Sequence, residues 1–226
     1  MKKIILCAVV CVMVAVGLFA CGGGGGSSNS GTSGTTYSNA TLTGPWLKSG
    51  QSYIIADGNG SITEHGQMNA YSPAGTYQLQ SNGDVTLNFF AGVYDPEWSA
   101  SGSFTSATTA VFPTSGGNET ITKVSNLAAC QGNWSGTITE TSGGSTSHPI
   151  SFTINSNGVV TAATGYTITS GKMFCESGVV RAFFKTTSSL PYNQIQIYGT
   201  VSGTSITGSF DCDSNNLRGS VSLTKQ

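Results

Sequence analysis

A pattern of short segments occurs twice along this chain, and this duplication constrains its fold more than any other feature. Each single match between the two copies is short, but the matches keep the same order and need only small gaps. They pair 43–46 with 131–134, 52–63 with 151–161, 75–90 with 171–184, 101–104 with 198–201, and 121–123 with 223–225. The sequence therefore predicts two copies of one structural unit, covering residues 39–125 and 126–226.

Short strands are predicted throughout both units. From Thr41 onward, runs rich in Val, Ile, Thr, Tyr and Phe alternate with clusters of Gly, Asn and Ser, which is typical of an all-β sandwich or barrel. Each unit divides into roughly eight strands, enough to close a small barrel without exposed edges. In the first unit we expect strands near 42–48, 51–56, 60–66, 75–80, 84–90, 97–104, 107–113 and 119–124. The predicted fold is all-β, with two tandem small antiparallel meander β-barrels.

The predicted strands also indicate what fills the barrels. Strands this short, eight to a barrel, leave an interior just wide enough for side chains. The residues of the first unit expected to face inward are Ile55, Tyr77, Leu79, Val85, Leu87 and Phe104. We therefore expect packed interiors rather than a hollow calyx.

Each unit begins with a Gly-x-Trp motif, Gly44-Pro45-Trp46 in the first and Gly132-Asn133-Trp134 in the second. This motif resembles the first-strand motif of lipocalins and related calycin barrels. The resemblance implies an up-and-down barrel, a fold that in those proteins holds a small hydrophobic ligand, and it makes a carrier of a small hydrophobic or sugar ligand one functional alternative.

Strand parity predicts what lies beside the two tryptophans. In an eight-stranded meander the last strand ends next to the start of the first. This places Lys123 near Trp46 and Lys225 near Trp134, where a cation over the indole face contributes roughly 0.5–2 kcal/mol. We interpret these four residues as structural parts of the barrel floors rather than as ligand contacts.

The amino-terminal segment predicts export and a lipid anchor. Lys2 and Lys3 precede an apolar run that ends at Leu18-Phe19-Ala20-Cys21, as in a secretory signal peptide over residues 1–20. The last four residues resemble the lipobox of bacterial lipoproteins. That resemblance implies a diacylglycerol on the Cys21 sulfur, cleavage just before Cys21, and a further acyl chain, such as palmitate, on the new amino terminus.

The residues after the lipobox predict where the protein resides. Gly22 stands where an aspartate would retain a lipoprotein at the inner membrane, so the resemblance implies anchoring at the outer membrane. Residues 21–38 are rich in Gly and Ser and predict a flexible tether, with a reach of roughly 20 Å.

Three cysteines remain for the mature units, since the others lie in the leader or carry the lipid. Cys130 aligns with Leu42 and Cys175 with Leu79 of the first unit, and strand parity puts both at one barrel end. In an oxidising compartment this favours a Cys130–Cys175 disulfide with Cys212 left as a thiol. A Cys175–Cys212 bond is the nearest alternative.

The sequence offers little for catalysis. Its two histidines, His65 and His148, do not occupy matching positions in the two units. No nucleophile elbow, zinc-protease motif or phosphate-binding loop is present, and the cysteine spacings suit no metal. We expect no enzyme activity, no metal and no cofactor. A formal net charge of −1 without a basic patch argues against nucleic acid as a partner.

One pair of loops is a candidate ligand-binding rim. The segment Tyr94-Asp95-Pro96-Glu97-Trp98 joins the fifth and sixth predicted strands and combines acids with aromatics. Its counterpart in the second unit carries Tyr192, Asn193 and Gln194. Such loops could stack on a sugar at a barrel mouth, and the alternative is an ordinary proline-containing surface turn.

These observations favour a lipid-anchored, non-catalytic cell-envelope protein with a binding, adhesion or scaffolding role. The expected partners are the membrane, through the acyl chains, and another envelope protein or a glycan. The alternatives are the small-ligand carrier and, last, a hydrolase.

Overall fold

The structure, a computed structural model, describes most of the chain after the predicted tether. The described residues are 35–49, 53–66, 74–91, 97–141, 145–164, 168–186, 194–212 and 217–226. Residues 35–226 belong to one compact unit. None of the helices in these segments has the length and apolar character needed to cross a membrane. The predicted signal peptide, Cys21 and most of the predicted tether lie outside the described residues.

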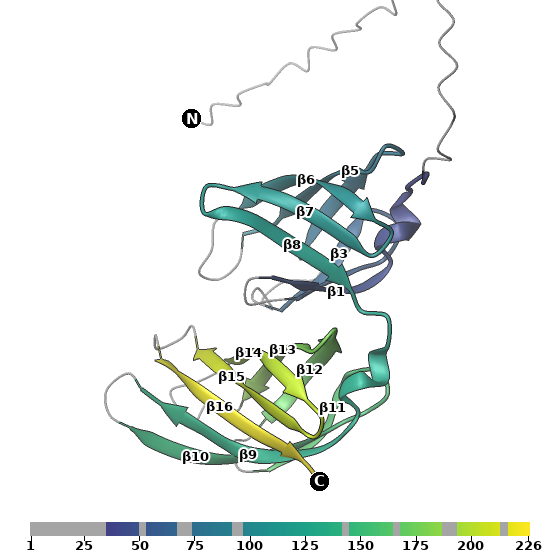
Figure 1. The fold of residues 1–226 in the computed structure, drawn as a ribbon. Coiled ribbons are helices and arrows are strands. Elements are labelled where there is room, and N and C mark those ends of the chain that lie inside the picture. The colour runs from purple at the N-terminus through teal and green to yellow at the C-terminus, as the bar shows by residue number, and fades with distance from the viewer. Residues whose placement is uncertain are drawn as a thin grey trace, which may run out of the picture. The chain divides into compact units, whose positions relative to one another are not determined.

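The first unit is a closed barrel in which each strand pairs with its neighbours in sequence and the last pairs with the first (Figure 1). A short 3₁₀ helix, η1 (Asn39–Leu42), precedes it. The strands are β1 (Gly44–Lys48), β2 (Tyr53–Ala56), β3 (Ser61–His65), β4 (Gly75–Leu79), β5 (Asp84–Phe89), β6 (Trp98–Ser106), β7 (Thr109–Thr114) and β8 (Gly117–Lys123).

The second unit repeats this topology after η2 (Leu127–Cys130). The strands are β9 (Gly132–Glu140), β10 (Thr146–Ile154), β11 (Val160–Thr164), β12 (Ile168–Glu176), β13 (Val179–Thr186), β14 (Gln194–Ser202), β15 (Ser205–Cys212) and β16 (Leu217–Lys225). β9 pairs with β16, and the sheet runs from β11 at one edge to β12 at the other. A bridge between Val159 and Lys172 and a 2.8 Å hydrogen bond from Met173 N to Gly158 O join these edges. The prediction of two tandem eight-stranded barrels is confirmed.

Each barrel has its own apolar core, as the short strands require. The first is built around residues such as Trp46, Phe104 and Phe112, and the second around residues such as Trp134, Phe152 and Phe184. The expectation for Ile55 was wrong. β2 pairs with β1 in an unbroken register that sets Ile54 opposite Trp46. Ile54 therefore enters the core, while Ile55 packs against a separate cluster.

The two tryptophans hold the start of each barrel in the same way. Trp46 Nε1 donates to Leu42 O at 2.8 Å, and Trp134 Nε1 donates to Cys130 O at 2.9 Å. Lys123 Nζ lies 5.5 Å from the Trp46 ring centroid, and Lys225 Nζ lies 5.8 Å from that of Trp134. Both lysines thus occupy the places that strand parity predicted.

The predicted Cys130–Cys175 disulfide is confirmed. It links the last residue of η2 to β12, and both cysteines are buried. In the first barrel the place of Cys130 is taken by the buried Leu42. The backbone of Cys212 ends β15, and its side chain lies outside the described residues, so the prediction of a thiol there stays a prediction.

Side chains from the two barrels also meet within the compact unit. Tyr53 packs edge-on against Phe174 at 5.0 Å between ring centroids, in a small apolar cluster with Leu47, Val124 and Phe183. The Tyr53 hydroxyl donates to Glu64 at 2.5 Å, and Lys172 forms an ion pair with the same carboxylate. Burial, and then the Glu64 charge, raise the pKa of Tyr53 well above its usual value, so this hydroxyl stays protonated and remains a donor.

Candidate functional site

Charged and aromatic side chains gather at one end of the first barrel. We call it the mouth end, where β1, β3, β5 and β7 finish and the next strands begin. Strand side chains alternate between faces, so Lys48 and Glu119 point inward like their strand neighbours Trp46 and Ile121, which belong to the core. The end layer consists of Lys48, His65, Phe89, Trp98 and Glu119.

The end layer is one connected set of contacts. Lys48 Nζ lies 3.3 Å from Glu119 Oε1, 5.1 Å from the Trp98 ring centroid and 5.9 Å from that of Phe89. The Phe89 and Trp98 rings stack with centroids 4.2 Å apart. The His65 ring lies 4.8 Å from the Phe89 centroid. A cation, a carboxylate, an imidazole and two aromatic rings therefore share the end of the barrel.

His65 is the least expected member of the layer. Its side chain is 1 % exposed, and neither ring nitrogen has a hydrogen-bond partner in the part of the chain that the structure describes. Burial, followed by the charge of Lys48, lowers the pKa of His65 to about 3. The imidazole is thus neutral near pH 7, with one donor and one acceptor. Because an unsatisfied buried polar atom costs about 1–3 kcal/mol, stability alone does not account for this histidine.

A pocket opens beside the layer, where β5 ends and β6 begins. Its volume is about 430 Å³, close to the lower end of known ligand sites (about 300–1,000 Å³). The residues lining it are Asn88, Phe89, Phe90, Glu97, Trp98 and Ser99. Phe90 is 37 % exposed, unusual for a large apolar side chain in this molecule. Ser99 Oγ donates to Asn88 Oδ1 at 2.8 Å and fixes a polar pair on the wall. We call this the mouth pocket.

Part of the predicted rim lies here. Glu97 and Trp98 both line the mouth pocket. Gln194 begins β14 in the second barrel, where it pairs with Lys185. The remaining rim candidates, Tyr94, Asp95, Tyr192 and Asn193, lie outside the described residues.

The second barrel shows what the same layer looks like without polar groups. Pairing registers match the barrels position by position: Trp46 pairs with Lys123 and Trp134 with Lys225. These and the neighbouring registers give the equivalent of each member of the end layer. Lys48 corresponds to Gly136, His65 to Ala163, Phe89 to Phe184, Trp98 to Ile195 and Glu119 to Val221. Only the phenylalanine is kept. At this level the second barrel has small and apolar side chains. Its strands continue beyond this level, where His148 pairs with Ile138 and His148 Nε2 lies 3.0 Å from Glu140 Oε1.

The backbone explains why Lys48 has no counterpart. A Cβ added at Gly136 would collide with the Ser222 carbonyl oxygen and lie 2.9 Å from Leu223 Cα. β9 and β16 therefore approach too closely at this point for any side chain.

Substituting Gly136→Ala is thus expected to destabilise the protein by about 1–3 kcal/mol, the usual range for overpacking. Urea unfolding followed by circular dichroism measures the change. The control is Gly116→Ala, whose added carbon meets only Thr114 Oγ1 at 4.0 Å, and which should unfold as the wild type does. Equal midpoints for Gly136→Ala and wild type would contradict the close approach.

The second barrel supports the backbone that carries the end layer. Arg181 on β13 is buried, and its Nε and Nη2 donate to the carbonyls of Lys48 and Ser49, both at 3.1 Å. Lys172 and Tyr53 hold Glu64, the residue before His65. The ends of β1 and β3 are thus fixed next to two members of the layer.

Replacing Arg181 with Met should lower the free energy of unfolding by about 1.5–3 kcal/mol, because the two carbonyls lose a charged donor. Thermal or urea unfolding measures this. Lys185→Met on the same strand is the control, because Lys185 is exposed. A loss as large in the control as in Arg181→Met would refute a specific role for the guanidinium.

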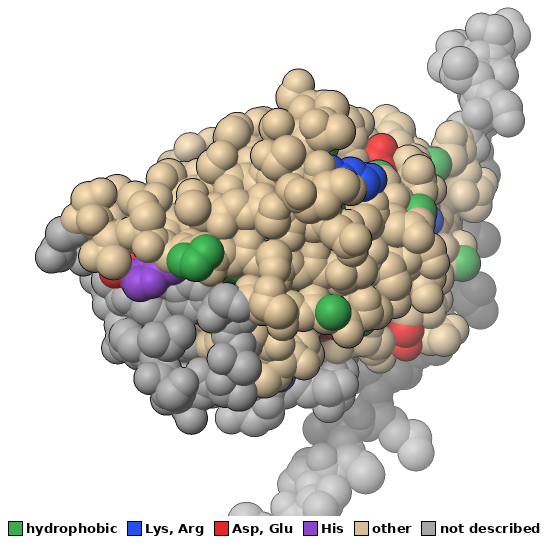
Figure 2. All heavy atoms as spheres, turned by 90° about the horizontal axis from the view of Figure 1, so that it is seen from below, with side chains coloured by type: hydrophobic (Ala, Val, Ile, Leu, Met, Phe, Trp, Pro, Cys, Tyr) green, Lys and Arg blue, Asp and Glu red, His purple; other side chains and the backbone are tan. Residues whose placement is uncertain are grey.

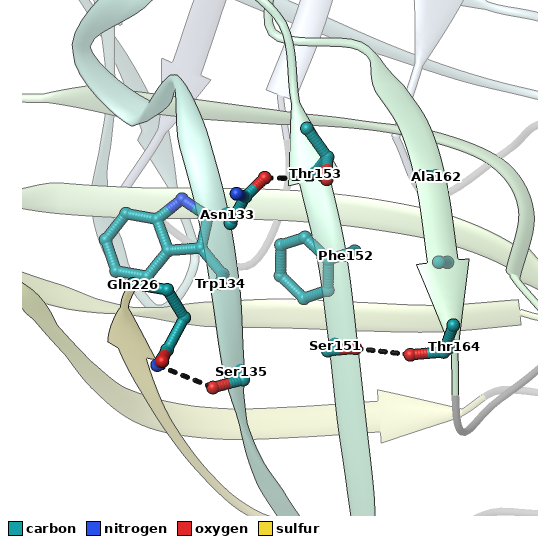
Figure 3. Close-up of a pocket in the computed structure, with 10 residues that line it drawn as sticks. Asn133, Trp134, Ser135, Ser151, Phe152, Thr153, Ala162, Thr164 and Gln226 are labelled. Carbon is teal, nitrogen blue, oxygen red and sulfur yellow. Dashed lines mark hydrogen bonds between the residues drawn. The ribbon is translucent and has the colours of Figure 1, made fainter.

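A second hollow crosses β9, β10 and β11, with a volume of about 400 Å³. Figure 3 shows its polar side chains joined in pairs: Thr153 with Asn133, Ser151 with Thr164, and Gln226 with Ser135. No charged side chain lines it. Figure 2 shows a face on which uncharged side chains and backbone predominate, with few charged groups. Because its aromatic side chains, Trp134 and Phe152, are buried, we regard this hollow as the weaker candidate.

Sequence reasoning missed most of the end layer. His65 reads as an ordinary polar strand end, and Lys48 and Glu119 lie 71 positions apart. One signal was present in the sequence. When the two copies are aligned, charged or titratable residues of the first copy correspond to Gly136, Ala163 and Val221 of the second copy.

In the described segments, no group of three or more His, Cys, Asp or Glu residues is placed to hold a metal ion. Comparison of the chain with protein-family models, with curated proteins and with solved structures found no match. The functional assignment therefore rests on the geometry of the mouth end.

Proposed function

We propose that this chain is a lipid-anchored, non-catalytic protein of the cell envelope that binds a small ligand at the mouth end of its first barrel. In this proposal the second barrel is a packed structural partner. The anchor is supported by the leader and by the lipobox-like residues that end at Cys21. Two or three acyl chains there would hold the protein on the membrane durably.

One observation carries the binding role: the two barrels share a fold and differ in their end layers. At the matching level the second barrel has the buried side chains Phe184, Ile195 and Val221, and its Glu140–His148 contact lies further along the strands. The first barrel instead keeps a partly buried ion pair and a buried histidine without hydrogen-bond partners among the described residues, features that are costly unless they serve a purpose. Beside them lies a pocket of ligand size.

A non-catalytic role fits the chemistry of this end. A histidine whose pKa is about 3 and whose side chain is buried is a poor proton acceptor near pH 7. Glu119 and Lys48 neutralise each other. The layer is therefore better suited to orient a ligand than to transform one.

The anchor is tested by fractionation. Wild-type protein should sediment with membranes and resist high salt, and Cys21→Ser should appear in the soluble fraction. A Cys21→Ser protein that stays with the membranes would remove the anchor from the proposal.

The binding role is tested with the full chain in detergent and a small-molecule extract of the envelope. Compounds that co-elute with the protein are identified by mass spectrometry. Trp98→Ile, which copies Ile195 of the second barrel, should lose compounds that the wild type retains. Identical retention by both proteins, or none by either, would refute a ligand site at the mouth end.

A further inference from the structure

We infer that the ligand of the mouth pocket is a neutral sugar, with its apolar face on Trp98 and Phe90 and its hydroxyl groups on the surrounding polar side chains. This inference rests on the proposed binding role and adds the chemical class of the ligand.

The aromatic side chains provide the first argument. Phe90 is 37 % exposed, and Trp98 is partly exposed although it stacks on Phe89. Both line one pocket. Partly exposed rings of this kind offer a large, rigid contact area to the C–H face of a ligand. A sugar ring presents such a face together with hydroxyls at its edge.

The polar groups provide the second argument. The pocket wall carries the Asn88–Ser99 pair and the exposed Glu97. This set contains both donors and acceptors. A hydroxyl group both donates and accepts hydrogen bonds. A ligand with several hydroxyls therefore matches these side chains better than a ligand whose groups can only donate or only accept.

Charge provides the third argument, because it disfavours ionic ligands. An anion would meet Glu97 at the pocket and would have to compete with Glu119 for Lys48, which lies 3.3 Å from that carboxylate. A cation over Trp98 would meet the Lys48 ammonium, already 5.1 Å from the ring centroid. A neutral ligand meets neither repulsion.

The histidine of the end layer lies behind the pocket wall. His65 lies against Phe89, the shared wall of the layer and the pocket. Its buried nitrogens, one donor and one acceptor in the neutral ring, have no partner among the described residues. His65 is not among the residues that line the pocket, so it supports the wall formed by Phe89 and does not itself contact the ligand.

The test titrates the full chain, purified in a sugar-free zwitterionic detergent, with three probes: a set of neutral oligosaccharides, choline, and an acidic sugar. Tryptophan fluorescence and calorimetry report binding. Trp98 is the partly exposed tryptophan, whereas Trp46 and Trp134 are buried, so binding at the mouth should change its emission.

Two substitutions copy residues of the second barrel and should therefore be tolerated by the fold. Trp98→Ile should weaken sugar binding by about tenfold, the loss of one aromatic contact. Glu97→Gln, which copies Gln194, should weaken it less. Asn133→Ala in the hollow of the second barrel is the control and should bind as the wild type does.

Each outcome decides a separate point. Binding of choline or the acidic sugar alone, lost in Trp98→Ile, would overturn the ligand class and keep the binding role. Sugar binding lost in Asn133→Ala and kept in Trp98→Ile would overturn the location. If no probe binds, the class is wrong when Trp98-dependent retention of envelope compounds persists, and the binding role fails when that retention is also missing.

Discussion

A variant with both Cys130→Ala and Cys175→Ala is expected to lose about 2–5 kcal/mol of unfolding free energy. The bond joins residues 45 positions apart, so it restricts a long loop of the unfolded chain. It also ties η2 to β12, the strand at one edge of the second sheet. The first barrel closes by full strand pairing and has Leu42 in place of Cys130.

Urea unfolding, read by circular dichroism, measures this loss. Wild-type protein under reducing conditions should unfold at the same urea concentration as the double variant, and the double variant should not respond to reductant. The interpretation fails if the double variant and the oxidised wild type have the same midpoint.

Acid should destabilise the protein through His65, and His65→Leu should relieve much of that effect. The pKa of this group is about 3 in the folded chain, against an ordinary value of 6.5. Between these pH values the unfolded chain binds a proton that the folded chain does not. The contribution of His65 to the unfolding free energy is therefore fully present above about pH 6.5. Below this pH the unfolding free energy falls by roughly 1.4 kcal/mol per pH unit toward pH 3.

The leucine variant has no proton to bind and no unsatisfied ring nitrogen. The difference in unfolding free energy between His65→Leu and the wild type should be about 2–3 kcal/mol larger at pH 4.5 than at pH 7, in favour of the variant. Urea unfolding across pH 4–7.5 tests this, since the carboxylates contribute equally to both proteins. Parallel curves for His65→Leu and wild type would exclude the neutral buried imidazole.

The behaviour of His65 also bears on function. If the histidine is kept for ligand binding, His65→Leu should be more stable than the wild type and bind less ligand. Such an exchange of stability against binding is common at functional sites.

The strand pattern and the repeat predicted most of the architecture. The all-β fold, the eight strands per unit, the pairing of first and last strands and the lysine beside each tryptophan all follow from period-two side-chain alternation in a closed meander. The Cys130–Cys175 bond followed from the same parity. Ile55 was misplaced because the pairing of β1 with β2 sets Ile54, and not Ile55, opposite Trp46, and a difference of one residue in register moves a side chain to the other face of the sheet.

The mouth end was only partly predictable. Glu97 and Trp98 stood out because a loop concentrates acids and aromatics in a few residues. Lys48, His65 and Glu119 did not, because they come from three different strands and meet only when the barrel closes.

The sequence by itself thus determined the local properties: strand periodicity, the duplication, the cysteines at one barrel end and the lipobox-like leader. Only the tertiary structure decided which side chains share the barrel end, how deeply His65 is buried, and how Arg181 of the second barrel reaches the carbonyls of Lys48 and Ser49. The physical reason is that alternation fixes the face on which a side chain lies, whereas its partners, its exposure and its pKa depend on strands distant in sequence that closure brings together.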